Sequence, residues 1–367
     1  MTGKSLTMLA VGDVVLQEPH GEFFLSKAAP VLKKGDVVVG QGEVVFTSRG
    51  YGTYVGMVHT ATSCPPVNMK ALATAGFDVI TLAGNHTWDS GAPGIEDTID
   101  GLRNLGITPV GAGMNLDEAK KPAIIERDGT RFGFLDYNCV GPIGSWATPA
   151  KPGAAFIQII THYEIRSANP GGAPDIYTFA EANSLNDMAD DVKKLRPICD
   201  VLVVVFHKGG DSGNREKLAM YDKQVSYAAI DAGADLILGH HAHVLKGIER
   251  YKGKVIFHGL ADFVPAYALE DEGQRKAHRF LSTYSSTVPP IDSDPVTKRT
   301  IIAKCTITNG KISRVGYLPC YINAQRQPEV LKKDEAGQQI FEFMKKITMG
   351  AGLSTEYKWK GDEVVII

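Results

Sequence analysis

Short apolar runs alternate with stretches of helical spacing along most of the chain, and this pattern predicts an α/β layer fold. Apolar residues three and four positions apart indicate helices between the runs, and glycines close several of them. The predicted strands are Leu6–Val11, Asp36–Val39, Phe77–Leu82, Arg131–Tyr137, Val201–Phe206, Leu236–Leu238 and Val255–Phe257. The predicted helices are Phe23–Leu32, Val67–Ala75, Pro93 to Gly106, Leu185–Leu195 and Leu218–Ala232.

The carboxyl-terminal part predicts a hairpin followed by a helix. Asn309-Gly310 separates two apolar runs, 301–307 and 312–318, and this dipeptide favours a tight two-residue turn. We expect a single domain over residues 1–325, with irregular excursions at 141–175 and 265–300. The first excursion should contain one strand, Ala155–Ile160. Residues 326–367 should add a helix near 335–347 and a terminal strand packed on the domain.

Composition and charge exclude several classes of protein. The 367 residues are 44% hydrophobic and 22% charged, as in ordinary soluble enzymes. The net charge of −2 argues against a nucleic-acid binder, which usually carries a basic excess. No window approaches the roughly 20 apolar residues of a membrane span. Gly12-Asp13 interrupts the first apolar run, so we expect no secretory signal, no membrane partner and a cytoplasmic location.

The cysteines point to neither disulfides nor a zinc–thiolate site. They are odd in number, widely scattered and form no CxxC motif. We therefore expect reduced, buried thiols at Cys64, Cys139, Cys199, Cys305 and Cys320.

Several predicted strands end on side chains that bind metal ions. Because ligands bind at the carboxyl ends of strands in open α/β sheets, such ends should converge in space. Mixed carboxylate, amide and imidazole groups suit a divalent ion. In the segment 239–243, alternation along an extended chain would place His241 and His243 on one face and turn His240 away. The residues at the strand ends are Asp13, Glu43, Asn85, His86, His207, His240, His241 and His243.

The order of these motifs resembles the CapA family, named for poly-γ-glutamate capsule synthesis, within the calcineurin-like metallophosphoesterase superfamily. The matching motifs are Gly-Asp at 12–13, Glu43 after a strand, and Asn-His-x-x-Asp-x-Gly at 85–91. His-x-Gly-x-Asp at 207–211 and Gly-x-His-x-His-Val at 239–244 complete the series. The resemblance covers about residues 6–325, with poor matching at 141–175 and 265–300.

This resemblance implies a four-layer α/β sandwich, two mixed β-sheets flanked by helices, with one or two divalent ions (Mn, Zn or Fe) at the strand ends. Asp13 and His243 would hold one ion. A second ion would bind Asn85, His207 and His241, and Glu43 would bridge the two. His86 would act outside the metals as a proton donor.

Several positions depart from the pattern that the resemblance implies. Val15 stands where the phosphoesterases have a histidine, so the first ion loses a ligand unless Glu18 or His20 replaces it. Glu43 replaces an aspartate, and Gln41 replaces an asparagine. Lys208 follows His207 where the family has tryptophan; it would bind a substrate carboxylate or lie solvated on the surface.

A few further residues are weaker candidates. Asp89 would orient His86, or cap the helix that follows it. His162 and Arg166, in the long excursion, would contact substrate or simply be solvated. His258, at the end of a predicted strand, is a further candidate for substrate binding; it lies in Phe257–Phe263, which resembles the Tyr-Ser-Leu-Gly-Asn-Phe segment of the family with one additional residue.

These observations predict a metal-dependent hydrolase. A bound divalent ion lowers the pKa of its water to about 7, which gives a metal-bound hydroxide at neutral pH. We expect attack on an amide, lactam or ester of a small acid or γ-glutamyl-type substrate. A phosphomonoesterase or phosphodiesterase is one alternative, and a non-hydrolytic protein of poly-γ-glutamate capsule biosynthesis is another. The metal identity, the substrate and any oligomer remain open.

Overall fold

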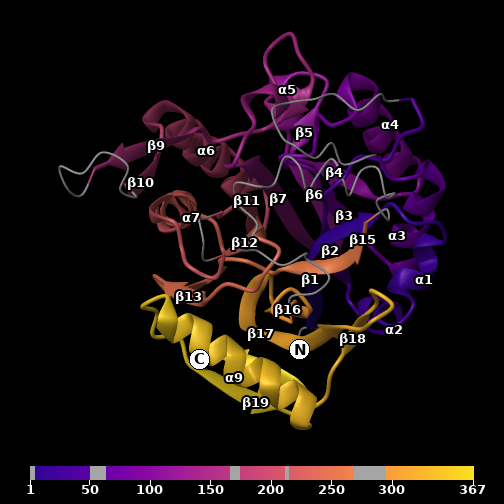
Figure 1. Cartoon of the computed structure of the whole chain (residues 1–367), viewed down its shortest axis with the longest axis vertical. Coiled ribbons are helices and arrows are strands. Elements are labelled where there is room, and N and C mark those ends of the chain that lie inside the picture. Colours follow the sequence, from indigo (N-terminus) through magenta and orange to yellow (C-terminus); the bar gives the residue numbers. More distant parts are fainter. Residues whose placement is uncertain (1–4, 50–62, 166–173, 211–214, 268–294) are drawn as a thin grey trace.

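The computed structural model describes residues 5–49, 63–165, 174–210, 215–267 and 295–367. Two large sheets face each other within these ranges (Figure 1). The first has the order β19-β20-β17-β16-β1-β2-β3-β4, with β15 paired to β1 and β18 paired to β17. The second has the order β13-β14-β12-β11-β7-β6. Two small ribbons, β5-β8 and β9-β10, lie outside them.

The strands of the first sheet are β1 (Leu6–Leu16), β2 (Val37–Gly42), β3 (Val79–Thr81), β4 (Thr108–Val110), β15 (Asp262–Ala266), β16 (Arg299–Thr308), β17 (Lys311–Ile322), β18 (Pro328–Val330), β19 (Tyr357–Lys360) and β20 (Glu363–Ile366). Those of the second are β6 (Ala123–Arg127), β7 (Thr130–Asn138), β11 (Val201–Lys208), β12 (Leu236–His241), β13 (Ile248–Tyr251) and β14 (Lys254–Phe257). The ribbons comprise β5 (Ala112–Gly113), β8 (Gly153–Ala154), β9 (Ile159–Glu164) and β10 (Asp175–Ala180).

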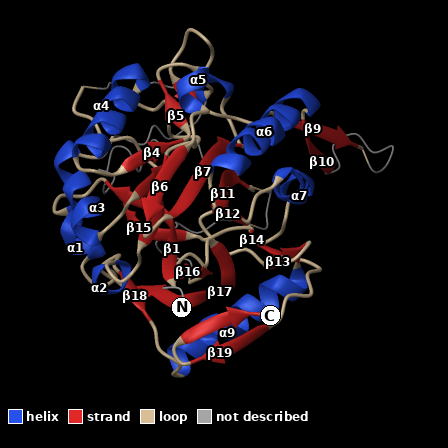
Figure 2. Ribbon diagram, turned by 180° about the vertical axis from the view of Figure 1, so that it is seen from behind, coloured by secondary structure: helices blue, strands red, loops and turns tan. Residues whose placement is uncertain are grey.

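Helices cover the outer face of each sheet (Figure 2). One side carries α1 (Gly21–Leu25), α2 (Ala29–Leu32), α3 (Met69–Ala75) and α4 (Gly91–Asn104). The other side carries α6 (Ala182–Leu195) and α7 (Met220–Ala232). The short α5 (Leu116–Ala119) lies beside β5, and α9 (Glu335–Gly350) lies near the carboxyl end.

Three apolar cores lie between these layers and hold them together. The central core lies between the sheets and joins residues such as Val39 of β2 with Phe134 of β7 and Val203 of β11. A second core packs α1–α4 onto the first sheet, and a third packs α6 and α7 onto the second. Strands β2, β7 and β11 are buried on both faces, as in covered parallel sheets, which explains their continuous apolar runs. The predicted four-layer α/β sandwich is confirmed.

Several predicted boundaries are wrong. β1 continues past Val11 to Leu16, so Asp13 lies inside a strand, at a register shift against its neighbours. The predicted helix 23–32 is two short helices, because Pro30 has no amide hydrogen and belongs in the first turn of α2. The predicted strand 155–160 is displaced, since β9 begins at Ile159 and pairs with β10. The hairpin at Asn309-Gly310 is confirmed as β16–β17.

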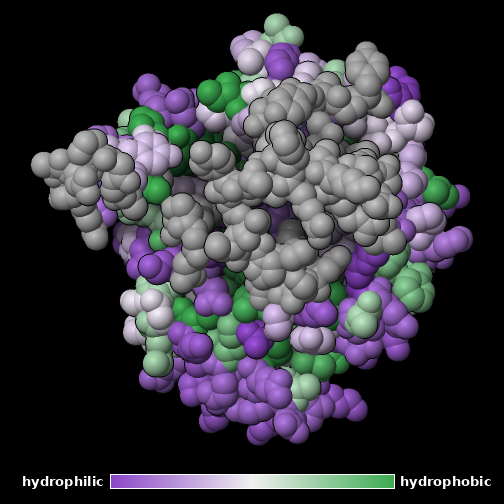
Figure 3. Space-filling view, viewed as in Figure 1, coloured by the Kyte–Doolittle hydropathy of each residue, from purple (hydrophilic) through white to green (hydrophobic). Residues whose placement is uncertain are grey.

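After α9 the chain forms two strands, β19 and β20, where one terminal strand was predicted. β20 pairs with β17 and β19 pairs with β20, so the hairpin extends the edge of the first sheet. Helix α9 buries Ile340, Phe341 and Met344 in the central core. The outward surface over α9 is mostly hydrophilic (Figure 3).

All five cysteines are free and buried, as predicted. Within the described ranges no helix has the length and apolar character to cross a bilayer. The cytoplasmic location stays a prediction.

Candidate metal centre

The predicted strand ends meet at one edge of the two sheets. In the first sheet β1, β2 and β3 run parallel, and in the second β11 and β12 do. Glu43 follows β2 directly, and Asn85 and His86 lie between β3 and α4. His207 is next to last in β11, and His241 is the last residue of β12. The common strand direction therefore brings residues distant in sequence to one place.

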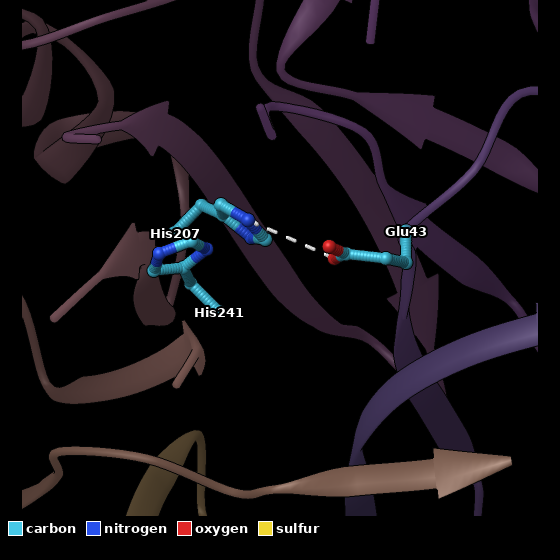
Figure 4. Close-up of side chains that lie close together, drawn as sticks. All are labelled: Glu43, His207 and His241. Carbon is cyan, nitrogen blue, oxygen red and sulfur yellow. Dashed lines mark ion pairs between the residues drawn. The ribbon is translucent and has the colours of Figure 1, made fainter. Parts of the chain in front are cut away.

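The first group of candidate ligands is Glu43, His207 and His241. Their ligand atoms all lie within 4.8 Å of one another. His207 Nε2 is 3.7 Å from Glu43 Oε2, and the two imidazole centroids are 4.8 Å apart. The two rings lie side by side, and His207 faces the carboxylate (Figure 4). Asn85 joins this group, since its Oδ1 is 2.7 Å from His207 Nε2.

The second group is Asp13, His243 and Asp262, again with ligand atoms within 4.8 Å. His243 Nδ1 is 2.8 Å from Asp262 Oδ1 and 3.6 Å from Asp13 Oδ2. Asp262 begins β15 and lies opposite Asp13 in the parallel pairing with β1. This group therefore holds two carboxylates and one imidazole, a harder set of donors than the first group.

Glu43 lies between the two groups. Its Oε2 faces His207, whereas its Oε1 is 3.9 Å from His243 Nε2. One carboxylate thus presents an oxygen to each group. This is the position expected of a bridging ligand, although the bridge between two ions remains a prediction.

His86 and Asp89 form a pair beside Glu43. His86 Nδ1 is 2.6 Å from Asp89 Oδ2, and His86 Nε2 is 3.9 Å from Glu43 Oε1. The contact with Asp89 is one that would orient the ring of His86. The N-cap residue of α4 is Ser90 and not Asp89. Burial lowers the pKa of His86, but the hydrogen bond with Asp89 and the charge of Glu43 outweigh it and raise that pKa.

Several polar atoms of the two groups have no hydrogen-bond partner among the residues that the structure describes. Buried polar atoms in folded proteins nearly always form hydrogen bonds. Yet both carboxylate oxygens of Glu43, Nδ1 of His207, Nδ1 of His241 and Oδ2 of Asp262 are buried without such a bond to any described residue. Unpaired carboxylate and imidazole atoms at one place are what a divalent ion would satisfy, so these residues fit a metal site.

The protonation states also suit metal binding. Burial, and then the neighbouring imidazoles, lower the pKa of His207 well below its ordinary value. Burial and His243 lower the pKa of His241 to about 3, so both rings are neutral with a free nitrogen lone pair. Burial and the charge of Asp13 raise the pKa of Glu43 to about 8. A metal ion would displace that proton, as metal ligands must be deprotonated.

Asp13 and His243 carry opposite charges in the metal-free protein. Burial raises the pKa of Asp13, but its hydrogen bond with His240 and the nearby imidazoles lower it overall. Burial lowers the pKa of His243, while Asp262, Glu43 and Asp13 outweigh this and raise it to about 10.

The prediction that His240 turns away is wrong. His240 Nδ1 is 2.9 Å from Asp13 Oδ1. The alternation rule holds for extended backbone, but φ is 86° at His241 and 55° at His243. The chain therefore turns at the end of β12, and all three histidines approach the two ligand groups.

Lys208 and His258 belong to a buried network and not to the candidate centre. Lys208 Nζ donates to Asp222 O and Ser226 Oγ, both at 2.9 Å, and lies 3.0 Å from His258 Nδ1. His258 Nε2 is 2.9 Å from Glu249 Oε2. Both side chains are fully buried, so neither a solvated surface lysine nor a substrate contact by these two residues agrees with the structure.

Other predicted residues lie away from the centre. His162 is exposed on β9, near Tyr177 of β10, and this ribbon lies at the periphery of the molecule (Figures 1 and 2). Arg166 lies outside the described residues. His20 is exposed, and Glu18 Oε1 is 3.9 Å from Arg326 Nη2. Neither His20 nor Glu18 replaces the missing histidine.

Asp262 lies beside Asp13 and His243, where the sequence offered Glu18 or His20 as an additional ligand. It was missed because β15 was not predicted, although it lies in the segment 257–263 that already resembled the family. Burial raises its pKa, and His243 and, more weakly, Arg215 oppose this effect. Val15, in contrast, is buried in the core under the helices.

Comparison with known proteins now identifies the family. The model of the family described as bacterial capsule synthesis protein PGA_cap matches residues 7–267. The chain belongs to this family. It is 30% identical over 272 residues to the capsule biosynthesis protein CapA of Bacillus anthracis, covering 71% of this chain and 60% of that protein. It is 27% identical to the PGA biosynthesis protein CapA of Bacillus subtilis, covering 81% and 76%.

A solved structure shows a more distant likeness. The chain is similar to the NAD nucleotidase of Haemophilus influenzae, with 13% identity and a TM-score of 0.42. The match covers 94% of this chain and 56% of that one. This likeness bears on neither the substrate nor the activity of the present PGA_cap protein.

Proposed function

We propose that this PGA_cap protein is a metal-dependent hydrolase. The observation that carries the proposal is the group of buried donor atoms without hydrogen-bond partners, contributed by both sheets at one edge. Glu43, His207, His241 and Asn85 would hold one ion. Asp13, His243 and Asp262 would hold a second, with Glu43 shared.

Bound divalent ions supply an activated water and polarise the bond under attack. The protein's own contribution is the placement of a proton. Because His86 Nδ1 faces Asp89, its Nε2 points toward Glu43 and the centre. There it can hold a proton for the leaving group, a role typically worth about 10²–10⁴-fold in rate.

The proposed substrate is an amide of a γ-glutamyl-type compound. Two relatives bear names of capsule and PGA biosynthesis, and the histidine of phosphoesterases is replaced by Val15. Lys208 cannot bind the substrate carboxylate, since it is fully buried and already contacts three groups of the protein. Arg215 is the better candidate, because it is only half-buried and close enough to Asp262 to influence its pKa.

The experiment compares two chromogenic substrates with the Mn²⁺-loaded protein. We expect release of p-nitroaniline from γ-glutamyl-p-nitroanilide, and its loss after chelation or in His86→Gln. Arg215→Met should raise KM with little change in kcat. Turnover of p-nitrophenyl phosphate alone would instead establish a phosphoesterase.

The family name also favours a protein of capsule assembly without hydrolytic activity. Metal content separates the two proposals. If the protein takes up neither Mn²⁺ nor Zn²⁺ after dialysis, the hydrolase proposal fails and the non-hydrolytic one stands.

A further inference from the structure

Two buried polar residues end β7, and the proposed chemistry uses neither of them: Asp136 and Asn138. They follow Phe134, which lies in the central core between the sheets. Because alternate residues of a strand share a face, both polar side chains point toward the first sheet. A buried polar group is costly unless it forms hydrogen bonds, so the partners of these two show what they do.

Asp136 binds the backbone of the chain as it leaves β3. Its Oδ2 accepts hydrogen bonds from Leu82 N at 2.9 Å and from Ala83 N at 2.7 Å. The carboxylate fits there because residue 111 is glycine, since a Cβ atom on Gly111 would overlap with this oxygen. A residue of the second sheet thus holds the segment that follows a strand of the first.

Asn138 holds the next part of the same segment. Its Nδ2 donates to Gly84 O at 3.0 Å, and its Oδ1 accepts from Val140 N at 2.9 Å. Gly84 directly precedes Asn85, and Asn138 lies opposite His207 in the parallel pairing of β7 with β11. One side chain therefore joins the segment of Asn85 to the strand beside His207, where Asn85 Oδ1 is 2.7 Å from His207 Nε2.

We propose that Asp136 and Asn138 are positioning residues of the metal centre, which hold Asn85 against His207 so that both bind the same ion. Apolar contacts between the two sheets are non-directional, whereas the hydrogen bonds to residues 82–84 fix both distance and direction. This inference rests on the proposed function, because it requires that Asn85 and His207 bind an ion.

The test measures the affinity of the metal-free protein for Mn²⁺ by calorimetry, with folding checked by circular dichroism. Asp136→Leu and Asn138→Leu should each weaken binding to the first group of ligands about 10- to 100-fold, the usual effect of removing a residue that orients a ligand. Asp136→Asn should bind Mn²⁺ as the wild type does, since its amide oxygen accepts the same two hydrogen bonds. Burial raises the pKa of Asp136 well above its ordinary value, so an uncharged amide is a close substitute.

A double-mutant cycle shows whether Asn138 acts through Asn85. Asn85→Ala removes the proposed ligand and should itself weaken Mn²⁺ binding. If Asn138 only positions Asn85, adding Asn138→Leu to Asn85→Ala should cause no further loss of affinity. Two independent effects would instead add in free energy.

Asn68→Leu is the matched control. Asn68 is also buried, its Nδ2 donates to Leu16 O and Glu18 O at 2.8 Å, and its Oδ1 accepts from Gly21 N at 3.1 Å. It thus holds a loop of the backbone as Asn138 does, but none of its partners is a candidate ligand. This variant should melt at a lower temperature than the wild type and bind Mn²⁺ equally well.

The inference and the proposed function fail in different ways. Equal Mn²⁺ affinity in wild type, Asp136→Leu and Asn138→Leu would overturn the inference alone, and so would additive losses in the cycle. Asn138→Asp, which keeps the size of the side chain and the bond with Val140 but removes the donor to Gly84, repeats the test should a leucine variant not fold. If the wild type takes up no metal, the hydrolase proposal is refuted and the inference falls with it.

Discussion

Replacement of Glu43 by glutamine should stabilise the metal-free protein at neutral pH. Burial and Asp13 raise the pKa of this carboxyl from 4.5 to about 8. When the folded state raises the pKa of a carboxyl group, the free energy of unfolding is unaffected at a pH below the pKa of the unfolded state. It then falls as the pH rises toward the pKa of the folded state. From pH 4.5 to 7 the cost grows by about 1.4 kcal/mol per unit, which gives about 3 kcal/mol at pH 7. Because the group is fully buried, solvent screening does not reduce this figure.

The assay is urea denaturation of chelator-treated wild type and Glu43→Gln at pH 4.5 and pH 7, followed by circular dichroism. We expect equal free energies of unfolding at pH 4.5 and a variant about 3 kcal/mol more stable at pH 7, with unchanged m-values. All other titrating groups are common to both proteins, so the difference reports Glu43 together with its interactions with Asp13, His243 and His86. With saturating Mn²⁺ the order should reverse, because a ligand that binds only the native state stabilises it.

Glu249→Gln provides the control of opposite sign. Burial raises the pKa of Glu249, but the hydrogen bonds of His258 and Tyr227 outweigh it and lower that pKa. A carboxyl group whose pKa is lowered in the folded state stabilises the protein at a pH above the pKa of the unfolded state. This stabilisation is lost as the pH falls through the pKa of the folded state. Glu249→Gln should therefore be less stable than wild type at pH 7. The reasoning is refuted if metal-free Glu43→Gln equals or falls below the wild type at that pH.

Three further outcomes follow from the centre and its surroundings. Asp262→Ala should lower the amount of bound metal measured by elemental analysis, whereas Glu18→Ala and His20→Ala should leave it unchanged. An unchanged metal content in Asp262→Ala would show that Asp262 neither binds the ion of the second group nor positions its ligands. His86→Gln should lower kcat about 10²–10⁴-fold at constant metal content, and a loss of metal instead would assign His86 to the ligands. Lys208→Met should lower the free energy of unfolding by about 3 kcal/mol because it breaks a buried ion-pair network, and an effect on KM alone would restore its role in substrate binding.

Much of the site could be predicted from the sequence because local patterns are governed by local physics. The run 201–206 is short and rich in valine, which favours a buried strand, and His207 follows it directly in sequence. The rule that parallel strands present their carboxyl ends at one edge then gathers Glu43, Asn85, His207 and His241 without coordinates. The hairpin at Asn309-Gly310 is equally local, since that dipeptide accepts the backbone angles of a tight turn.

What the tertiary structure decided depends on contacts between distant segments. Asp262 is a candidate ligand only because β15 pairs with β1 and places it opposite Asp13. Lys208 is not part of the centre because Asp222, Ser226 and His258 surround its ammonium group, and none of these residues is near it in sequence. His240 approaches Asp13 because φ becomes positive at His241, which a pattern of apolar and polar residues does not encode. Side-chain direction at a strand end is set by the packing of its neighbours, whereas the existence of the strand is set by its own residues.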